Sequence, residues 1–443
     1  MKHRNIRKRI NHLLVLTVAA VAVQARVSAV ELSYDGTGDV AIIPYISADN
    51  GFNSLFSIRN TGDTPVATRL VVRNGDDGSP LATAILFLSP AQQLRMAAAR
   101  LIDHDAILFP ETTACVLGSQ PADNFPEIPA SDRIDHAWAE VYEVGTLTAD
   151  QAEGLRDNCD SGQELIGTTL NPASGALAVD AHLIHVFYGF NLTLQTTVLR
   201  NFGGPAQLHS LTTDAPSLDD ARAESTIAGQ TLTWSTGAAA VSSVLALSSF
   251  SSVFQAEEVV DGKTDIVLTF PTRHLLSPSP ESPFEPEGEN GQLLPMSIVN
   301  REGADVSGQP TSKCTPPPPP QPPYFGPELQ GSQMSIHFQP DPLLAIPVAE
   351  PAGIDMYAEI GGCIFTGFEP VWDFMEAGSV HFSLAEHSAT SLEGSVVTGL
   401  PVLPVSITTI SNGILVDETG ERFLSNYGLT NAIALERGVP SKD

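Results

Sequence analysis

The sequence predicts a mainly β protein of immunoglobulin-like β-sandwich architecture, built as two sandwich units with a few short helices. Strand-like runs and turn-forming pairs alternate from Asp39 to Pro80, in DVAIIPYISADNGFNSLFSIRNTGDTPVATRLVVRNGDDGSP, where Asn-Gly and Asp-Gly favour tight hairpin turns. The chain has 443 residues, of which 42% are hydrophobic, so it exceeds one ordinary domain and can bury a substantial core. We expect an N-terminal unit at 30–210 and a C-terminal unit at 211–443.

The first 29 residues have the pattern of a secretory signal peptide. Five basic residues within positions 2–9 precede an apolar run at 13–23, and small residues follow up to Ala29. Cleavage is favoured after Ala29, with Ala25 as an alternative. A membrane anchor is less favoured, because the apolar run is shorter than the roughly 20 residues of a spanning helix. We therefore expect export to the periplasm, the cell surface or the medium, with no transmembrane segment in the mature chain.

The charge balance is strongly acidic, with 22 Lys and Arg against 51 Asp and Glu. Removal of residues 1–29, which hold six basic and no acidic residues, would change the net charge from −29 to −35. This charge argues against nucleic acid and anionic membranes as partners. Self-association or a surface glycan is the expected kind of contact.

The four cysteines favour two disulfides over a metal site. The chain has no Cys-x-x-Cys pair and no histidine at metal-ligand spacing beside a cysteine. In an exported chain such cysteines pair with one another, and three connectivities are open. We favour Cys115 with Cys159 and Cys314 with Cys363, because each pair then links two segments of one half.

Strands are expected first at 40–47 and 54–59, joined as a hairpin by the Asn-Gly turn, and then at 66–74 and 81–89, so that the opening forms a β-meander with one buried face. The segment 89–102 combines a helix-cap pattern with alternation, and we favour a strand. Residues 104–133 are expected to form a long loop held by a disulfide. Further strands are expected at 136–145 and 176–194, on either side of a short helix at 147–159 that begins with a Thr148–Gln151 capping box.

The second half mixes short helices, strands and a proline-rich loop. We expect a short capped helix at 217–224 and a buried helix in the small, apolar stretch 235–259. Strands follow at 264–276 and 294–303, and several short ones lie between Gln330 and Tyr427. The loop 315–327 contains a run of prolines, which favours a stiff polyproline II spacer.

No catalytic, metal or cofactor site is predicted. Asp180, His182 and His185 are the most metal-like group, but in a strand the two histidines lie on opposite faces. The segments 103–105 and 132–136 place acids beside a histidine without a Gly-x-Ser-x-Gly nucleophile motif. NGDDGSP is better explained as a hairpin turn than as a calcium loop. Asn191-Leu192-Thr193 matches the glycosylation acceptor pattern, which matters only in a eukaryotic secretory pathway.

Four segments resemble a family of exported Gram-negative bacterial proteins that is itself uncharacterised. They are IIPYISADNGFNSLFSIRNTGD with its Pro-Tyr and Asn-Gly opening motif, TDIVLTFPTRH with a central Thr-Phe-Pro-Thr motif, GLPVLPVSITTISNG and LSNYG. The opening has Ile46 where a second aromatic residue is more typical of the family. The resemblance implies an exported protein with one continuous architecture. It brings no catalytic residue to this chain.

The expected function is structural or adhesive and non-enzymatic, at the cell surface or outside the cell, with self-assembly as one form of it. The segment 30–40, VELSYDGTGDV, is a candidate for strand donation to a neighbour. The alternative is a carbohydrate-binding module, and a secreted hydrolase comes third. Aromatic residues would stack on sugars in the alternative, although core packing is the favoured role of each tryptophan; the candidates are Trp138, Trp234, Trp372, Tyr142 and Tyr324.

Overall fold

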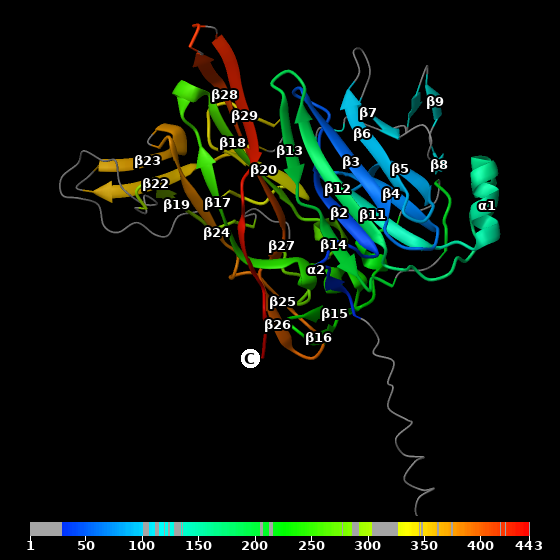
Figure 1. Ribbon diagram of the computed structural model, residues 1–443. Coiled ribbons are helices and arrows are strands. Elements are labelled where there is room, and N and C mark those ends of the chain that lie inside the picture. The colour runs from blue at the N-terminus through cyan, green and yellow to red at the C-terminus, as the bar shows by residue number, and fades with distance from the viewer. Residues whose placement is uncertain are drawn as a thin grey trace, which may run out of the picture.

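The computed structural model describes residues 29–100, 106–110, 115–118, 120–122, 125–127, 134, 136–203, 207–211, 216–276, 278–285, 292–303, 327–344, 346, 349–360, 363–373, 375–416, 418–420 and 422–442. The chain is mainly β, as predicted, and its sheets are almost entirely antiparallel. Figure 1 shows the N-terminal half in blue to green and the C-terminal half in green to red, beside and below it. Residues 1–28 of the predicted signal peptide, the proline-rich run 315–326 and Cys314 lie outside the described residues.

The N-terminal half holds a seven-stranded sheet in the order β1-β14-β2-β11-β4-β5-β8 and a five-stranded sheet in the order β13-β12-β3-β6-β7; β9 and β10 form a separate pair. The strands are β1 (Glu31–Leu32), β2 (Val40–Ile46), β3 (Phe52–Asn60), β4 (Val66–Asn74), β5 (Pro80–Leu88), β6 (Gln93–Arg100), β7 (Ala106–Pro110), β8 (Cys115–Leu117), β9 (Gln120–Ala122), β10 (Phe125–Glu127), β11 (Ala137–Thr146), β12 (Leu177–His185), β13 (Phe190–Leu194) and β14 (Thr197–Arg200). Buried residues of both large sheets, among them Tyr45 and Leu70 from one and Phe56 and Leu183 from the other, belong to one hydrophobic cluster. The two sheets therefore pack face to face.

The C-terminal half repeats this arrangement with the sheets β19-β24-β17-β27, to which β30 adds, and β21-β20-β18-β28-β29. Its strands are β15 (Glu224–Ile227), β16 (Gln230–Thr233), β17 (Ala246–Gln255), β18 (Gly262–Thr269), β19 (Met296–Asn300), β20 (Gln333–His337), β21 (Ala349–Pro351), β22 (Gly353–Ile360), β23 (Cys363–Pro370), β24 (Ala377–Ser383), β25 (Ser388–Thr390), β26 (Ser395–Thr398), β27 (Leu400–Pro401), β28 (Leu403–Val416), β29 (Arg422–Thr430), β30 (Ala434–Arg437) and β31 (Pro440–Lys442). Phe250 and Phe382 from the first sheet pack in one cluster with Ile266 and Ile336 from the second.

The two halves share a buried interface, although each large sheet takes its strands from one side of residue 211. Val267, Leu343 and Ile407 of the C-terminal half belong to the N-terminal hydrophobic cluster. The side-chain amide of Gln333 donates to the carbonyl oxygen of Pro44 at 3.0 Å and to that of Ala137 at 3.3 Å. Buried apolar contacts and hydrogen bonds thus join the halves into one packed body.

Several predicted elements are confirmed. The helix α1 (Ala149–Asp157) begins with the predicted capping box between Thr148 and Gln151. The ambiguous segment after Ser89 is the strand β6, and β4 pairs with β5 through the NGDDGSP turn. The predicted disulfide between Cys115 and Cys159 is present, with 5.3 Å between the Cα atoms. It ties β8 to the turn that follows α1.

The predicted first hairpin is wrong. Asn50 and Gly51 have the positive φ angles, 50° and 80°, that the Asn-Gly pair favours. However, β2 pairs with β11 and β14, whereas β3 pairs with β12 and β6. The turn therefore carries the chain from one sheet to the facing sheet, and the opening strands do not form a meander.

Three further predictions need correction. The helix α2 covers only Gly237–Leu245, and the rest of 235–259 contains β17, whose Phe250 stacks on Phe382 of β24 with ring centroids 4.4 Å apart. The stretch 217–224 contains a single 3-10 turn, Leu218–Asp220. The segment 104–133 is not a plain loop, because its described residues include the short strands β7 to β10. Cross-strand packing outweighs local propensity in these segments.

Candidate binding surface

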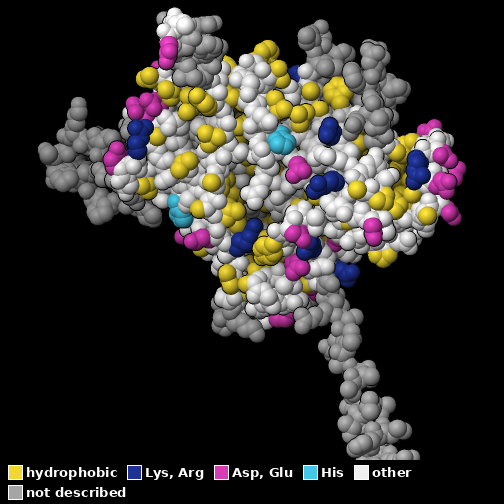
Figure 2. All heavy atoms as spheres, in the orientation of Figure 1, with side chains coloured by type: hydrophobic (Ala, Val, Ile, Leu, Met, Phe, Trp, Pro, Cys, Tyr) yellow, Lys and Arg dark blue, Asp and Glu magenta, His cyan; other side chains and the backbone are white. Residues whose placement is uncertain are grey.

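The five-stranded sheet of the N-terminal half, β13-β12-β3-β6-β7, carries a mixture of apolar and basic side chains on its outer face. Figure 2 shows hydrophobic side chains beside a histidine and Lys or Arg side chains over the region where β3, β12 and β13 lie in Figure 1. Acidic side chains are most crowded at the end of the molecule that α1 covers, and a few also lie on this face. The exposed residues of β3 include Leu55, with 37% of its surface accessible, and Arg59. One face of this sheet thus combines both kinds of group.

The strand register aligns an apolar row across this face. Leu55 of β3 stands opposite His182 of β12 on one side and Ala97 of β6 on the other. Ala97 in turn stands opposite Phe109 of β7. Residues directly opposite on the same face of neighbouring strands are in side-chain contact range. The row runs along the floor of an open groove of about 470 Å³.

Polar groups border this apolar row. The groove is also lined by Ser57, Gln93 and Arg95, which lie on the same face of β3 and β6. His182 Nδ1 lies 3.4 Å from the hydroxyl of Thr193 on β13. Arg95 forms no ion pair with any residue that the structure describes. The groove therefore combines an apolar floor with donor groups at its border.

The turn between β12 and β13 presents three consecutive exposed hydrophobic residues. Val186, Phe187 and Tyr188 have 63%, 87% and 48% of their surface accessible. The Tyr188 ring lies against the His185 ring, with centroids 4.6 Å apart, and stacks on Phe190 at 5.6 Å. We call residues 186–188 the aromatic tip.

His185 is the inner support of the aromatic tip. Its ring packs edge-on against Phe52 at 4.7 Å, and its Nδ1 accepts a hydrogen bond from the Tyr188 backbone at 3.3 Å. A Cβ on Gly51 would come within 2.7 Å of His185 Nε2, so glycine permits this close approach. Burial is the main cause that lowers the pKa of His185. A neutral imidazole therefore holds the tip in place.

The predicted position of the two histidines is confirmed, because β12 is a strand. His182 borders the outer groove, whereas His185 is buried under the tip. Asp180 is exposed on the outer face, in the row next to His182. Asp103, His104, Asp105 and Asp132 lie outside the described residues. His136 is buried and donates from Nε2 to the Gln333 carbonyl at 3.0 Å, which links the two halves.

Two of the three tryptophans are buried and cannot stack on a ligand. Trp138 donates to a Glu140 carboxylate oxygen at 3.3 Å, and Trp234 donates to the hydroxyl of Ser225 at 2.9 Å. Tyr142 is buried as well. Trp372 is half-buried and stacks on the His337 ring, with centroids 5.7 Å apart. Tyr324 lies outside the described residues.

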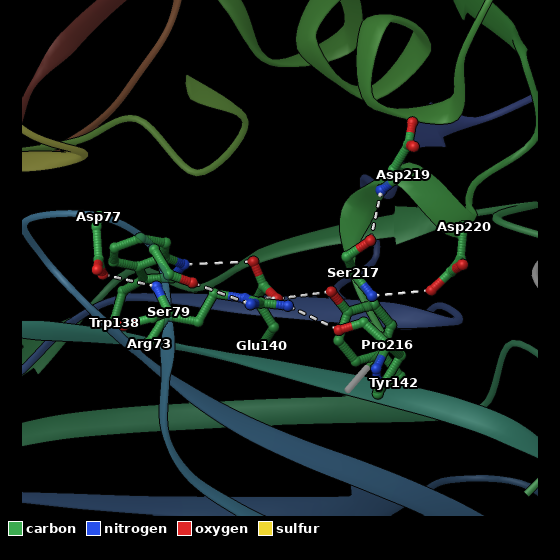
Figure 3. A network of polar contacts seen from close by, with 11 residues as sticks. Arg73, Asp77, Ser79, Trp138, Glu140, Tyr142, Pro216, Ser217, Asp219 and Asp220 are labelled. Carbon is green, nitrogen blue, oxygen red and sulfur yellow. Dashed lines mark hydrogen bonds and ion pairs between the residues drawn. The ribbon is translucent and has the colours of Figure 1, made fainter. Parts of the chain in front are cut away.

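A buried polar network surrounds Glu140, as Figure 3 shows. The carboxylate pairs with the guanidinium of Arg73 and accepts a hydrogen bond from the Tyr142 hydroxyl at 2.6 Å. Arg73 also donates to the carbonyl oxygens of Gly78 at 3.1 Å and Pro216 at 2.7 Å. Burial is the main cause that raises the pKa of Tyr142. The ion pair is buried, and it anchors the chain at Pro216 to the N-terminal half.

Comparisons with protein-family models, with curated proteins and with solved structures found no match. Among the described residues, no helix is long and apolar enough to cross a membrane. The groove was not predicted from the sequence, because its residues come from four strands that are brought together only by the fold. The aromatic tip has a single turn signal in the sequence, Gly189, because Val186, Phe187 and Tyr188 are residue types that favour a continued strand.

Proposed function

We propose that the protein is an exported, non-enzymatic structural or adhesive component of the cell surface or its surroundings, and that copies of the chain associate. The observation that carries this proposal is the aromatic tip, residues 186–188, exposed at the end of the β12–β13 hairpin. Contiguous exposed apolar side chains usually mark a contact surface. Two immunoglobulin-like sandwich units would serve as the rigid scaffold that presents it.

The tip has the properties of a contact that is ready to form. The Tyr188 ring is already ordered by His185 and Phe190, so this side chain has little freedom left to lose on association. Tyrosine and phenylalanine bury a large area for few rotatable bonds and are frequent at the centres of interfaces. An acidic chain that otherwise repels its copies needs such a local apolar contact.

Other features support export. The signal-peptide pattern and the Cys115–Cys159 disulfide both fit an oxidising compartment. Strand donation by residues 30–40 has less support, because Glu31 and Leu32 already pair with β14 of the same chain. Carbohydrate binding through tryptophan also has less support, since Trp138 and Trp234 are buried.

Light scattering of the mature chain, residues 30–443, over a concentration series tests the proposal. We expect the wild type to associate as concentration rises. Phe187→Ser should raise the concentration of half-association at least about tenfold, because a central aromatic contact contributes about 2 kcal/mol or more. A matched control is Leu392→Ser, which removes an exposed apolar side chain outside the tip, with 61% of its surface accessible.

Leu392 lies in the turn between β25 and β26, which is at the bottom of Figure 1, whereas the turn that joins β12 and β13 is at the top. Its substitution should leave association unchanged. A wild-type chain that stays monomeric at every concentration would refute self-association. Equal effects of the two substitutions would show that the tip has no special role.

A further inference from the structure

We propose that the groove on the outer face of the five-stranded sheet binds an amphipathic carboxylate, such as a medium-chain fatty acid. The acyl chain would lie along the row from Leu55 to Phe109, and the carboxylate would pair with Arg95. The groove is separate from the aromatic tip, so this inference does not depend on self-association.

The floor of the groove suits an apolar chain. Leu55, Ala97 and Phe109 occupy adjacent positions on three neighbouring strands, so they form a continuous row and not isolated apolar residues. Met96 and Pro110 extend the apolar lining. A volume of about 470 Å³ lies within the range of roughly 300–1,000 Å³ that small-molecule sites occupy. Covering this floor with an acyl chain removes apolar surface from water.

The charges on this face select an anion. Arg95 lines the groove, and Arg59 is its diagonal neighbour, because Arg95 stands opposite Ser57 and Arg59 stands opposite Gln93. Neither arginine is paired with an acid within the described part of the chain. Two unpaired guanidinium groups on one face are notable in a protein with 51 acidic and 22 basic residues. Their positive charge attracts a carboxylate locally.

The donors fit a carboxylate in particular. A guanidinium presents two parallel N–H groups that match the two carboxylate oxygens, and the Gln93 amide adds a further donor at the same border. Asp180 is exposed on the same face but stands opposite Ser57, on the far side of β3 from Arg95. His182 lies at the opposite end of the apolar row from Phe109. The anionic group is therefore expected at the β6 side of the groove.

Isothermal titration calorimetry tests the inference, with decanoate and decanol as probes. The parent chain is the mature Phe187→Ser variant, so that the aromatic tip does not contribute to binding. We expect decanoate to bind and decanol to bind at least about tenfold more weakly, since the alcohol cannot form the charge-assisted pair with a guanidinium. Arg95→Gln should weaken decanoate binding by a similar factor. Ala97→Trp should abolish it by filling the groove.

The matched control is Arg156→Gln, which removes an exposed arginine on α1, away from the groove. This variant should bind decanoate like the parent chain. Circular dichroism checks that each variant is folded, which is expected because Arg95 is exposed and its guanidinium supports no described ion pair. No binding of decanoate to the parent chain would overturn the inference, and so would equal binding of decanol. Either result would leave the proposal of self-association unaffected, because light scattering of the wild type tests that proposal separately.

Discussion

His274 is half-buried, and neither of its inaccessible ring nitrogens has a hydrogen-bond partner among the described residues. Its ring lies 5.9 Å from that of Trp138 and directly against Gly78, whose φ of +73° and missing Cβ make room for it. Burial, and then the positive charge of Arg73, lowers the pKa of His274 to about 4, while Glu140 and Asp77 act in the opposite direction. The imidazole is therefore neutral in the folded protein above this pH.

This depressed pKa predicts a pH dependence of stability. Between pH 6.5 and about 4 the unfolded chain protonates this histidine while the folded chain does not, so the free energy of unfolding falls as the pH is lowered. His274→Leu should remove this contribution, on the order of 2 kcal/mol between pH 7 and pH 4, because a partly exposed group realises less than its full shift. Urea unfolding at a series of pH values measures it.

Asp265 changes with pH in the opposite direction, since burial raises its pKa to about 6 and its charged form is the less stable one in the fold. Asp265 is present in the wild type and in His274→Leu, so its contribution cancels when their free energies of unfolding are compared. His381→Leu is the matched control, because His381 is exposed on β24. Parallel pH profiles for wild type and His274→Leu would contradict the prediction.

At the scale of the elements, local sequence signals predicted strands and turns more reliably than strand partners. The Asn50-Gly51 turn has the backbone conformation that its residues favour, yet it joins two sheets and not two paired strands. One of the two partners of β3 is β12, more than a hundred residues further along the chain. Such a pairing depends on tertiary packing, which hairpin signals in a single sequence do not contain.

The disulfide holds a peripheral layer of elements. Cys115 and Cys159, separated by 44 positions, join β8 to the turn after α1, where Phe87, Leu117 and Leu155 form a small cluster apart from the main core. Replacing both cysteines by alanine should lower the free energy of unfolding by about 2–4 kcal/mol, because the unfolded chain is no longer constrained. Denaturant unfolding of the double variant, with and without reductant, measures this.

The stability of the Cys115→Ala/Cys159→Ala variant should not change with reductant. A remaining effect of reductant in it would reveal a second disulfide, between Cys314 and Cys363. A Cys314→Ala/Cys363→Ala variant serves as the comparison, since any remaining effect of reductant in it comes from the Cys115–Cys159 bond. An unchanged unfolding midpoint in the Cys115→Ala/Cys159→Ala variant would show that the Cys115–Cys159 disulfide does not contribute to stability.

At the scale of the whole molecule, the sequence predicted two β-rich halves but not how they meet. Gln333 and Thr269 have the appearance of ordinary polar strand residues in the sequence, yet both are fully buried at the junction. The Thr269 hydroxyl donates to the Pro44 carbonyl at 2.6 Å and accepts from Gln333 at 2.8 Å. The edge strands β13 and β29 also meet, through a hydrogen bond from the Thr430 hydroxyl to the Thr193 carbonyl. Polar residues of this kind reveal their role only when the facing surface is known.

Because the two halves share this buried junction, we expect them to unfold together. Gln333→Ala removes the buried amide that donates to the Pro44 and Ala137 carbonyls and to the Thr269 hydroxyl, which should cost about 1–3 kcal/mol. Hydrogen exchange of peptides from β11 and β20 should report the same loss of protection in both halves, because each relies on the shared core. Gln330→Ala, at an exposed position beside the junction, should change neither. Loss of protection in β20 alone would mean that the halves open independently, with the interface contributing little to either.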